Sequence, residues 1–430
     1  MKDILFDLRS DHLAGRRSGR VAICSIRREV LAAALESARS CDDHLLVEAT
    51  ANQVNQFGGY SGMTPAAFAD YMRQLAASMG FPRSRVLLGA DHLGPYVWRD
   101  ESAERAMHKA LELARQCVYA GFIKIHLDTG FGCIDDPQPE LPPETAAERA
   151  VTLCQAAEAA AEHIPGNDSR PHYVIGIEVP PPGGALEASG PPEVTSIEKL
   201  QGILQLYEAR FRAARLESAW NRVMAVVVQP GIEFGDQLVA HYRSQSARAL
   251  SLFHDRLPTH MIYEVHSADY QTSDNLARMV ADHFILLKVG PCLTNSFREA
   301  VFELARIESE RLARRRSVKL SSIREVLETV MLENPSYWQS HYRGSEERLR
   351  FLRSHSKRDR IRYYWDHPAV ANALQLLMAN LRSSWSPTWA EAHRSEASSP
   401  LPSDQPPNDP AALIRQRIHS TLEPYLKACA

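Results

Sequence analysis

Eight short runs of aliphatic and β-branched residues are spaced along the first 290 residues of the chain. They span residues 21–26, 45–50, 86–92, 122–128, 173–179, 223–230, 261–267 and 284–290. Runs of this length are typical of buried strands. Between most of them lie stretches rich in Ala, Leu, Glu and Arg, which favour helices: 101–120, 144–163, 197–218 and 273–282. Strand and helix alternating eight times predict a parallel (β/α)8 barrel of the TIM type.

An open, doubly wound sheet is the alternative architecture for a strand–helix repeat. Such a sheet would carry a glycine-rich first turn, G-x-G-x-x-G or G-x-x-x-x-G-K-[ST], and neither follows any of the runs. Beyond the barrel, which we place at 1–295, helical patterns at 295–315, 323–333 and 368–381 predict additional helices at 296–382 that cap or flank it. A Ser- and Pro-rich linker is expected at 383–410 and a terminal helix at 411–430, docked on the body or on a partner subunit.

Composition narrows the class of protein. Lys and Arg number 49 and Asp and Glu 52, a net charge of −3, and this balance argues against a nucleic-acid-binding protein. No apolar run approaches the length that a membrane span needs, and the first residues lack the apolar core of a secretory signal. The 7 cysteines form no C-x-x-C pair, which argues against a zinc ribbon or a disulfide scaffold. We therefore expect a cytoplasmic protein with reduced thiols.

Polar residues gather at the carboxyl ends of the predicted strands, where the active sites of such barrels lie. In strand order they are Glu48 and Thr50, then Asp91 and His92, then Lys124, His126 and Asp128, then Glu178, Gln229, Glu264 with His266, and Lys288. The period of two along a strand places Lys124, His126 and Asp128 on one face of the fourth strand. By the same rule Glu264 and His266 share one face of the seventh strand. Since the opposite faces must pack against helices, these side chains should point into the barrel.

Several ionisable groups in one lumen are costly unless a metal or a substrate compensates them. Histidines and carboxylates on different strand ends suit a divalent ion, zinc first, with manganese, magnesium or nickel as alternatives. Such an ion would polarise a carbonyl or stabilise an enediolate while a carboxylate moves protons. Taken singly, however, His92 and His126 are more typical of structural hydrogen bonding, and Lys124 and Lys288 are as typical of buried ion pairs as of substrate contacts.

Two loops add candidate ligand contacts. The segment 52–60 after the second strand is rich in amides and glycine, which suits a hydroxyl-bearing ligand, although an ordered surface loop is the alternative. After the eighth strand, Thr294 and Asn295 resemble a helix cap. A helix starting there would bind phosphate or simply be capped.

Several longer motifs resemble those of one family. EATANQVNQFGGYSGMTP, LLGADHLGP, AGFIKIHLD, YVIGIEVPPPGG, VVVQPGIEF, YEVHSADYQT, FILLKVGP and DRIRYYW appear in matching order between about 21 and 381. They are similar to the GatZ/KbaZ family, large subunits associated with class II D-tagatose-1,6-bisphosphate aldolase. The resemblance implies a (β/α)8 barrel related to metal-dependent aldolases that act on ketose phosphates.

The resemblance also implies roles for particular residues. Asp91 and His92 are similar to the acid/base Asp and metal-binding His of class II aldolases, and Glu264 would be a second acid/base. Asp128, Glu178 and His266 are expected as further metal ligands or supporting groups. Expected substrate contacts are Glu48, Asn52, Gln53, Gln56, Gln229, Ser267, Asp269 and Lys288. The chain departs from the pattern at Arg27, where the family would carry small residues and His; the arginine would bind a phosphate or carboxylate.

Two functions remain open at the level of sequence. One is a retro-aldol enzyme acting on ketohexoses or their phosphates, either a C4 epimerase or an aldolase component; the other is a non-catalytic subunit that stabilises a separate class II aldolase. A Schiff-base aldolase using Lys288 is a minor third option, opposed by the surrounding carboxylates. Expected partners are a ketose or ketose phosphate, a class II aldolase catalytic subunit under the second function, and further copies of this chain.

Overall fold

The computed structural model describes residue 5 and residues 7–15, 19–137, 141–164, 170–176, 183–185, 192–383, 385–386 and 407–430. Glu178 and most of the predicted linker at 383–410 lie outside the described residues.

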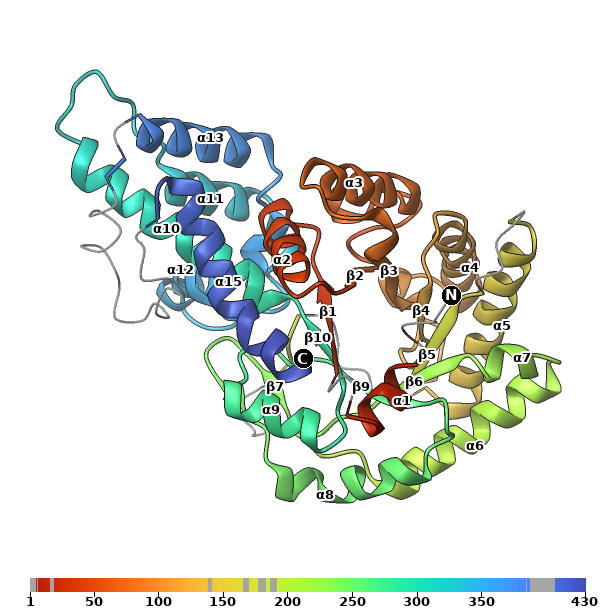
Figure 1. The fold of residues 1–430 in the computed structure, drawn as a ribbon. Helices are drawn as coiled ribbons and strands as arrows, with labels where there is room; N and C mark the ends of the chain where they lie inside the picture. Colours follow the sequence, from red (N-terminus) through yellow and green to blue (C-terminus); the bar gives the residue numbers. More distant parts are fainter. Residues whose placement is uncertain are drawn as a thin grey trace.

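Eight parallel strands close into a barrel, which confirms the predicted fold class (Figure 1). The strands are β1 Arg20–Cys24, β2 Leu45–Thr50, β3 Val86–Leu93, β4 Lys124–Asp128, β5 His172–Gly176, β6 Val223–Val227, β9 Ile262–Val265 and β10 Leu286–Val289. Their order around the barrel follows the sequence, and β1 pairs with β10 to close it. Each of the eight barrel strands overlaps one of the runs predicted from the sequence. A small antiparallel pair, β7 Glu233–Phe234 and β8 Val239–Ala240, forms in the loop after β6.

Helices surround the barrel on its outer face (Figure 1). They are α2 Arg28–Ser40, α3 Pro65–Ser78, α4 Ala103–Tyr119, α5 Pro143–Glu162, α6 Ile197–Ala213, α8 Ser244–Phe253, α9 Ser273–Ala281 and α10 Pro291–Leu312, with the short α1 Leu8–Leu13 and α7 Glu217–Trp220. The buried face of α5 consists largely of alanines, which allow the helix to approach its neighbours closely. At the start of α3, Thr64 accepts a hydrogen bond from the Ala67 amide, as an N-cap does.

The start of α10 differs from the prediction. The helix begins at Pro291, so the predicted cap at Thr294 and Asn295 is wrong. Proline suits the first helical position, and the Asp269 carboxylate accepts hydrogen bonds from the backbone amides of Gly290 and Cys292. These amides are therefore already satisfied by a protein group, which opposes phosphate binding at this helix end.

The C-terminal third adds α11 Ile323–Glu333, α12 Glu346–His355, the 3-10 turn η6 Arg360–Tyr363, α13 Pro368–Arg382 and α15 Pro410–Cys429. The terminal helix α15 lies against the body of its own chain, beside α2 and α10 (Figure 1). Arg417 forms an ion pair with Glu303 at 2.8 Å, and the Tyr425 hydroxyl donates to the Ala268 carbonyl at 3.0 Å. Because α10 crosses residue 295, the division into barrel and helical region at that point stays a prediction.

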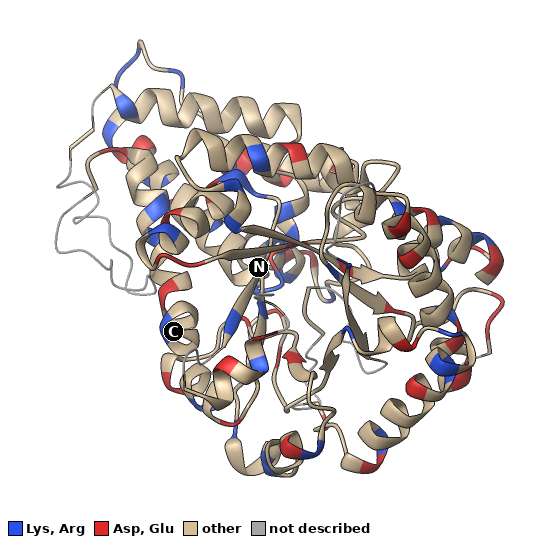
Figure 2. Cartoon of the chain, turned by 45° about the vertical axis from the view of Figure 1, so that its right-hand side comes forward, with Lys and Arg blue, Asp and Glu red and all other residues tan. Residues whose placement is uncertain are grey.

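Charges on the outer helices are mixed in sign. Figure 2 shows Lys and Arg, in blue, interspersed with Asp and Glu, in red, along these helices. Among the described residues, no helix combines the length and apolar character needed to cross a membrane.

Candidate functional site

The lumen holds an interlocked group of buried charges. Lys124 on β4 donates a hydrogen bond to the Glu48 carboxylate at 2.5 Å and forms an ion pair with the Glu264 carboxylate at 2.7 Å. Lys288 on β10 lies 3.3 Å from each of the same carboxylates and also contacts Asp91 at the end of β3. Glu48, Lys124 and Glu264 are completely buried. The period of two therefore places the charges inside the barrel, as the sequence predicts.

One glycine makes room for this group. Gly89 pairs in register with Glu48 on the neighbouring strand. A Cβ atom at residue 89 would lie 2.8 Å from the Glu48 Cγ atom. The absence of a side chain there allows the glutamate to extend into the lumen.

Three imidazole rings meet above the charged group. His92, His126 and His266 have ring centroids 5.1–5.3 Å apart, pair by pair. The His126 Nδ1 lies 2.8 Å from an Asp91 carboxylate oxygen, and the His266 Nε2 lies 2.9 Å from Glu264. Nitrogen and oxygen atoms of Asp91, His126, Glu264 and His266 lie within 4.8 Å of one another. The His126 Nε2 is buried and has no hydrogen-bond partner.

The third ring is oriented by a carboxylate. His92 Nδ1 lies 2.7 Å from Asp128 Oδ2, while its Nε2 lies 3.4 Å from Asp91. His92 has a positive φ of 51°, and the register of β3 with β4 shifts between Ala90 and Leu93. A left-handed backbone costs about 1 kcal/mol or more for a residue with a side chain, and such outliers cluster at functional sites. The strand is thus distorted where it presents this imidazole.

Burial and neighbouring charges shift the pKa values of Asp91, Glu264 and His266. Burial opposes ionisation of Asp91, but His92, Lys288 and His126 lower its pKa well below the usual range. Burial likewise opposes ionisation of Glu264, and Lys124 and Lys288 lower its pKa. Burial and the charge of Lys288 lower the pKa of His266 to about 3, so this ring is neutral and can bind a metal.

The lysines are held in the charged form. Burial lowers the pKa of Lys288, but Asp91, Glu48 and Glu264 raise it above the usual range. A cationic amine is no nucleophile, which opposes the Schiff-base option. Four buried carboxylates, with Asp128 as the fourth, face two ammonium groups in this lumen. The carboxylates thus outnumber the ammonium groups by two, and histidines or a bound cation must compensate the remaining negative charge.

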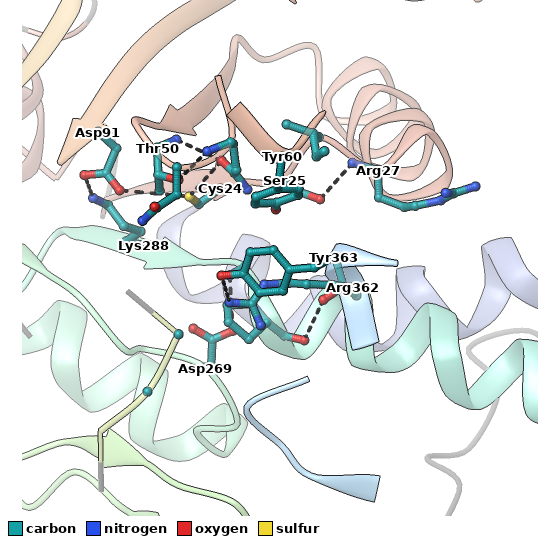
Figure 3. A pocket seen from close by; sticks show the side chains of 18 of the residues that line it. Cys24, Ser25, Arg27, Thr50, Tyr60, Asp91, Asp269, Lys288, Arg362 and Tyr363 are labelled. Atoms are coloured by element: carbon teal, nitrogen blue, oxygen red, sulfur yellow. Dashed lines mark hydrogen bonds and ion pairs between the residues drawn. The ribbon is translucent and has the colours of Figure 1, made fainter. Parts of the chain in front are cut away.

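A cavity lies at this end of the barrel, and Figure 3 shows several of the residues that line it. Its floor includes Asp91, His92, His266 and Lys288, whereas Glu48, Lys124, His126 and Glu264 do not line it. Its walls include Cys24, Arg27, Asn52, Gln53, Tyr60, Gly183, Ser267, Asp269, Arg362 and Tyr363. The predicted contacts Asn52, Gln53, Ser267, Asp269 and Lys288 therefore come together at one opening.

Besides Glu48, which contacts Lys124 and Lys288 and does not line the cavity, two predicted substrate contacts are engaged elsewhere. The Gln56 amide donates to the Lys109 carbonyl at 3.0 Å, and the Gln229 side chain accepts from the amides of Gly231 and Ile232 at 2.9 Å. Neither lines the cavity. The roles of these two residues, like that of Glu178, stay predictions.

The sequence interpretation assigned no role to several residues that line the cavity. Arg362 and Tyr363 belong to the motif DRIRYYW, far from any strand end, and Tyr60 lies in the amide-rich loop. The motif was visible as a family resemblance, but its position in the fold was not.

The family model and the curated relatives indicate the same family. A family model described as D-tagatose-1,6-bisphosphate aldolase subunit GatZ/KbaZ-like matches residues 5–430. The chain is 42% identical over 433 residues to the D-tagatose-1,6-bisphosphate aldolase subunit GatZ of Klebsiella pneumoniae, covering 100% of this chain and 99% of the relative. It is 45% identical over 385 residues to the GatZ subunit of Salmonella enteritidis, covering 89% and 88%.

A solved structure shows the same overall arrangement. The crystal structure of a probable tagatose 6 phosphate kinase from Sinorhizobium meliloti 1021 superimposes with a TM-score of 0.84 at 38% sequence identity. The match covers 96% of this chain and 100% of that one.

Proposed function

Because the chain belongs to the GatZ/KbaZ-like family of D-tagatose-1,6-bisphosphate aldolase subunits, we propose that it carries a metal-dependent retro-aldol site of its own. The substrates would be ketohexoses or their phosphates, and the outcome either C4 epimerisation or aldol cleavage. The buried convergence of ligand atoms from Asp91, His126, Glu264 and His266 is the observation that supports this proposal best. A subunit that only stabilises a partner has no use for such a costly arrangement.

The residues fit a divalent metal ion. Donor atoms of Asp91, His126, Glu264 and His266 converge within one coordination sphere, and the unpaired His126 Nε2 is buried beside them. His92, with its Nδ1 bound to Asp128, resembles a ligand oriented by a second carboxylate. The mixed nitrogen and oxygen set favours zinc, with manganese, nickel and magnesium as alternatives. When bound, the ion would act as a Lewis acid on the ketose carbonyl.

The chain's own groups would move the proton and hold the charge. Asp91 lies on the cavity floor and is ionised, so it can accept the proton of the C4 hydroxyl. As the C4 oxygen becomes a carbonyl, the C3–C4 bond breaks and its electrons pass toward the C2 carbonyl oxygen. The cationic Lys288 on the same floor would stabilise the negative charge that develops there.

Glu264 lies one layer deeper and would act differently. It does not line the cavity, but it contacts His266, Lys124 and Lys288. In this proposal it would help to hold the ion and would position those groups, in place of the proton transfer expected from the sequence.

The fate of the aldehyde decides the outcome. If the aldehyde turns before the bond reforms, the product is the C4 epimer; if it leaves, the reaction is aldol cleavage.

The test uses the chain purified alone. Metal content would be measured alongside an NMR assay on D-tagatose, D-fructose and their phosphates, with His126→Ala, His266→Ala and the exposed control His108→Ala. We expect about one metal ion per chain and interconversion or cleavage that the first two variants reduce by more than about 100-fold, since a Lewis acid contributes several kcal/mol. Full turnover without metal, or unchanged turnover in both variants, contradicts the proposal.

The stabilising-subunit function gives a different pattern. It predicts no metal and no turnover in the isolated chain, and activity only when a separate class II aldolase subunit is added. It also predicts that the partner's thermal stability falls when this chain is withheld, and that His266→Ala leaves this effect intact.

A further inference from the structure

One wall of the cavity comes from outside the barrel strands. The turn η6, Arg360–Tyr363, is carried by the C-terminal helices, yet Arg362 and Tyr363 line the same cavity as His92 and His266. Figure 3 shows Arg362 and Tyr363 facing Ser25 and Tyr60, apart from Asp91 and Lys288. The rings of Tyr60 and Tyr363 have centroids 4.3 Å apart.

The two guanidinium groups of this turn lack a carboxylate partner. Within the part of the chain that the structure describes, neither Arg360 nor Arg362 forms an ion pair, whereas the neighbouring Arg298 pairs with Asp359 at 2.8 Å. Arg360 donates to the Tyr337 carbonyl at 2.6 Å and to the Tyr363 hydroxyl at 3.1 Å. Their direct hydrogen-bond partners are neutral oxygens, although Arg360 is only 6% exposed, and the nearest carboxylates, Asp359 and Asp269, act on Arg362 without forming an ion pair with it. A buried positive charge without a counterion is expensive.

Arg362 also retains unused donors. It donates to the Asp359 and Arg358 carbonyls and to the Tyr363 hydroxyl. A guanidinium carries five N–H groups in a planar fork, and these bonds use three of them. The remaining donors are available to a ligand in the cavity.

A glycine leaves space beside the Arg362 guanidinium at the cavity wall. Gly183, which lines the cavity, lies in the loop that follows β5. A Cβ atom at residue 183 would lie 2.6 Å from the Arg362 Nη2 and 3.3 Å from the Arg360 Nη1. Any side chain at this position would cover the unpaired donors.

Arg27, the arginine that the sequence suggested for anion binding, is already neutralised. Its Nε and Nη2 donate to the two oxygens of the Glu29 carboxylate at 2.5 and 3.0 Å, and its Nη1 to Asp366 at 3.1 Å. Two carboxylates thus compensate one guanidinium. An anion entering the cavity gains far more from Arg362 than from Arg27.

We propose that Arg362, supported by Arg360 and Tyr363, forms a subsite for a phosphate group of the substrate. This assignment rests on the proposed function, because it makes the ketose a phosphate ester whose reacting carbons lie over the histidines. The planar fork of the Arg362 guanidinium suits two phosphate oxygens, and Arg360, which does not line the cavity, adds a second positive charge behind it that favours the nearly double charge of a phosphate. The C-terminal helices therefore complete the site by selecting the charged end of the sugar.

Calorimetric titration of the metal-free full-length chain tests the subsite without requiring turnover. The probes are inorganic phosphate, a ketohexose 6-phosphate and a hexuronate, and the variants are Arg362→Ala, Arg362→Lys and the exposed control Arg343→Ala. We expect Arg362→Ala to weaken binding of both phosphate probes by about 10- to 100-fold, the loss typical of a charge-assisted contact. Arg362→Lys keeps the charge without the fork and should lose about 3- to 10-fold. Arg343→Ala should match the parent.

Three results would overturn the subsite: no phosphate binding by the parent chain, equal binding by Arg362→Ala with an unchanged melting temperature, or tighter binding of the hexuronate. Turnover separates this proposal from the previous one. Metal-dependent conversion of free ketohexoses without phosphate binding would leave the retro-aldol site standing and remove the subsite. Phosphate binding lost in Arg362→Ala, in a chain without metal or turnover, would retain the subsite and remove the retro-aldol site.

Discussion

The floor and the Arg362 wall of the cavity are built in opposite ways. Here the floor includes the lumen residues Glu48, Lys124, His126, Asp128 and Glu264 that lie beneath the cavity. It consists of strand-borne groups that contact one another: each lysine contacts at least two carboxylates, and each histidine contacts at least one. The wall consists of arginines from a turn between helices, held by carbonyl and phenol oxygens and left without counterions among the described residues.

Because of this difference, substitutions in the floor should mainly lower the stability of the fold, and substitutions in the wall should mainly lower affinity for a ligand. Removing one member of the floor leaves a buried opposite charge without its partner, so folding should suffer. Removing a wall arginine breaks no ion pair among the described residues, so folding should change less while binding of an anion suffers. The floor presents carboxylates and imidazoles and the Arg362 wall a guanidinium, which would orient a ligand whose anionic end lies at Arg362.

The largest expected effect lies in the floor. Lys124→Met removes the ammonium group that both Glu48 and Glu264 contact, and we expect a loss of about 3–5 kcal/mol in the free energy of unfolding. Urea denaturation followed by circular dichroism measures it. Lys427→Met, which removes an exposed ion pair with Glu423, should cost less than about 1 kcal/mol.

The same urea denaturation measures how much less the Arg362 wall contributes to stability than the floor. Arg362→Ala should cost less than Lys124→Met, about 1–3 kcal/mol, because it loses three hydrogen bonds but breaks no ion pair. A loss for Arg362→Ala equal to that for Lys124→Met would mean that the wall is also a structural ion network, and the comparison would fail.

Metal loading should stabilise the floor. A divalent ion that binds only the folded chain raises the free energy of unfolding by about 2.7 kcal/mol at a hundredfold excess over its dissociation constant. Thermal melting with zinc, manganese, nickel or magnesium, before and after chelation, would show the rise for the preferred ion. His266→Ala should abolish it, and a shift that survives in this variant would place the ion elsewhere.

Asp128→Asn tests the carboxylate that orients His92. The amide can still accept from His92 Nδ1 but carries no charge, so the imidazole is held less firmly. We expect metal affinity to fall about 10- to 100-fold, measured by competition with a chromophoric chelator. The exposed variant Asp70→Asn serves as the control, and unchanged affinity in Asp128→Asn would remove His92 from the metal site.

The floor could be predicted from the sequence far better than the wall, and the cause is physical. A strand alternates its side chains with a period of two, so the amino-acid pattern alone assigns Lys124, His126 and Asp128 to the lumen. Gln229 shows the limit, because its side chain bonds within its own loop, and loop geometry has no such period. Arg362 depends on how the C-terminal helices dock on the barrel, a long-range contact that no local pattern encodes.

Tyr363 offers the smallest and most specific test of the wall. Its hydroxyl accepts hydrogen bonds from Arg360 and Arg362, both at 3.1 Å, while its ring stacks on Tyr337 with centroids 4.7 Å apart. Tyr363→Phe keeps the stack and removes the oxygen, so the guanidiniums lose a shared anchor but not their charge. We expect about 1 kcal/mol less stability and phosphate binding weakened by about 3- to 10-fold, measured by the same calorimetry. The exposed variant Tyr119→Phe should change neither quantity. If Tyr363→Phe instead weakened phosphate binding as much as Arg362→Ala, the phenol itself would be the contact with the anion and the arginines its support.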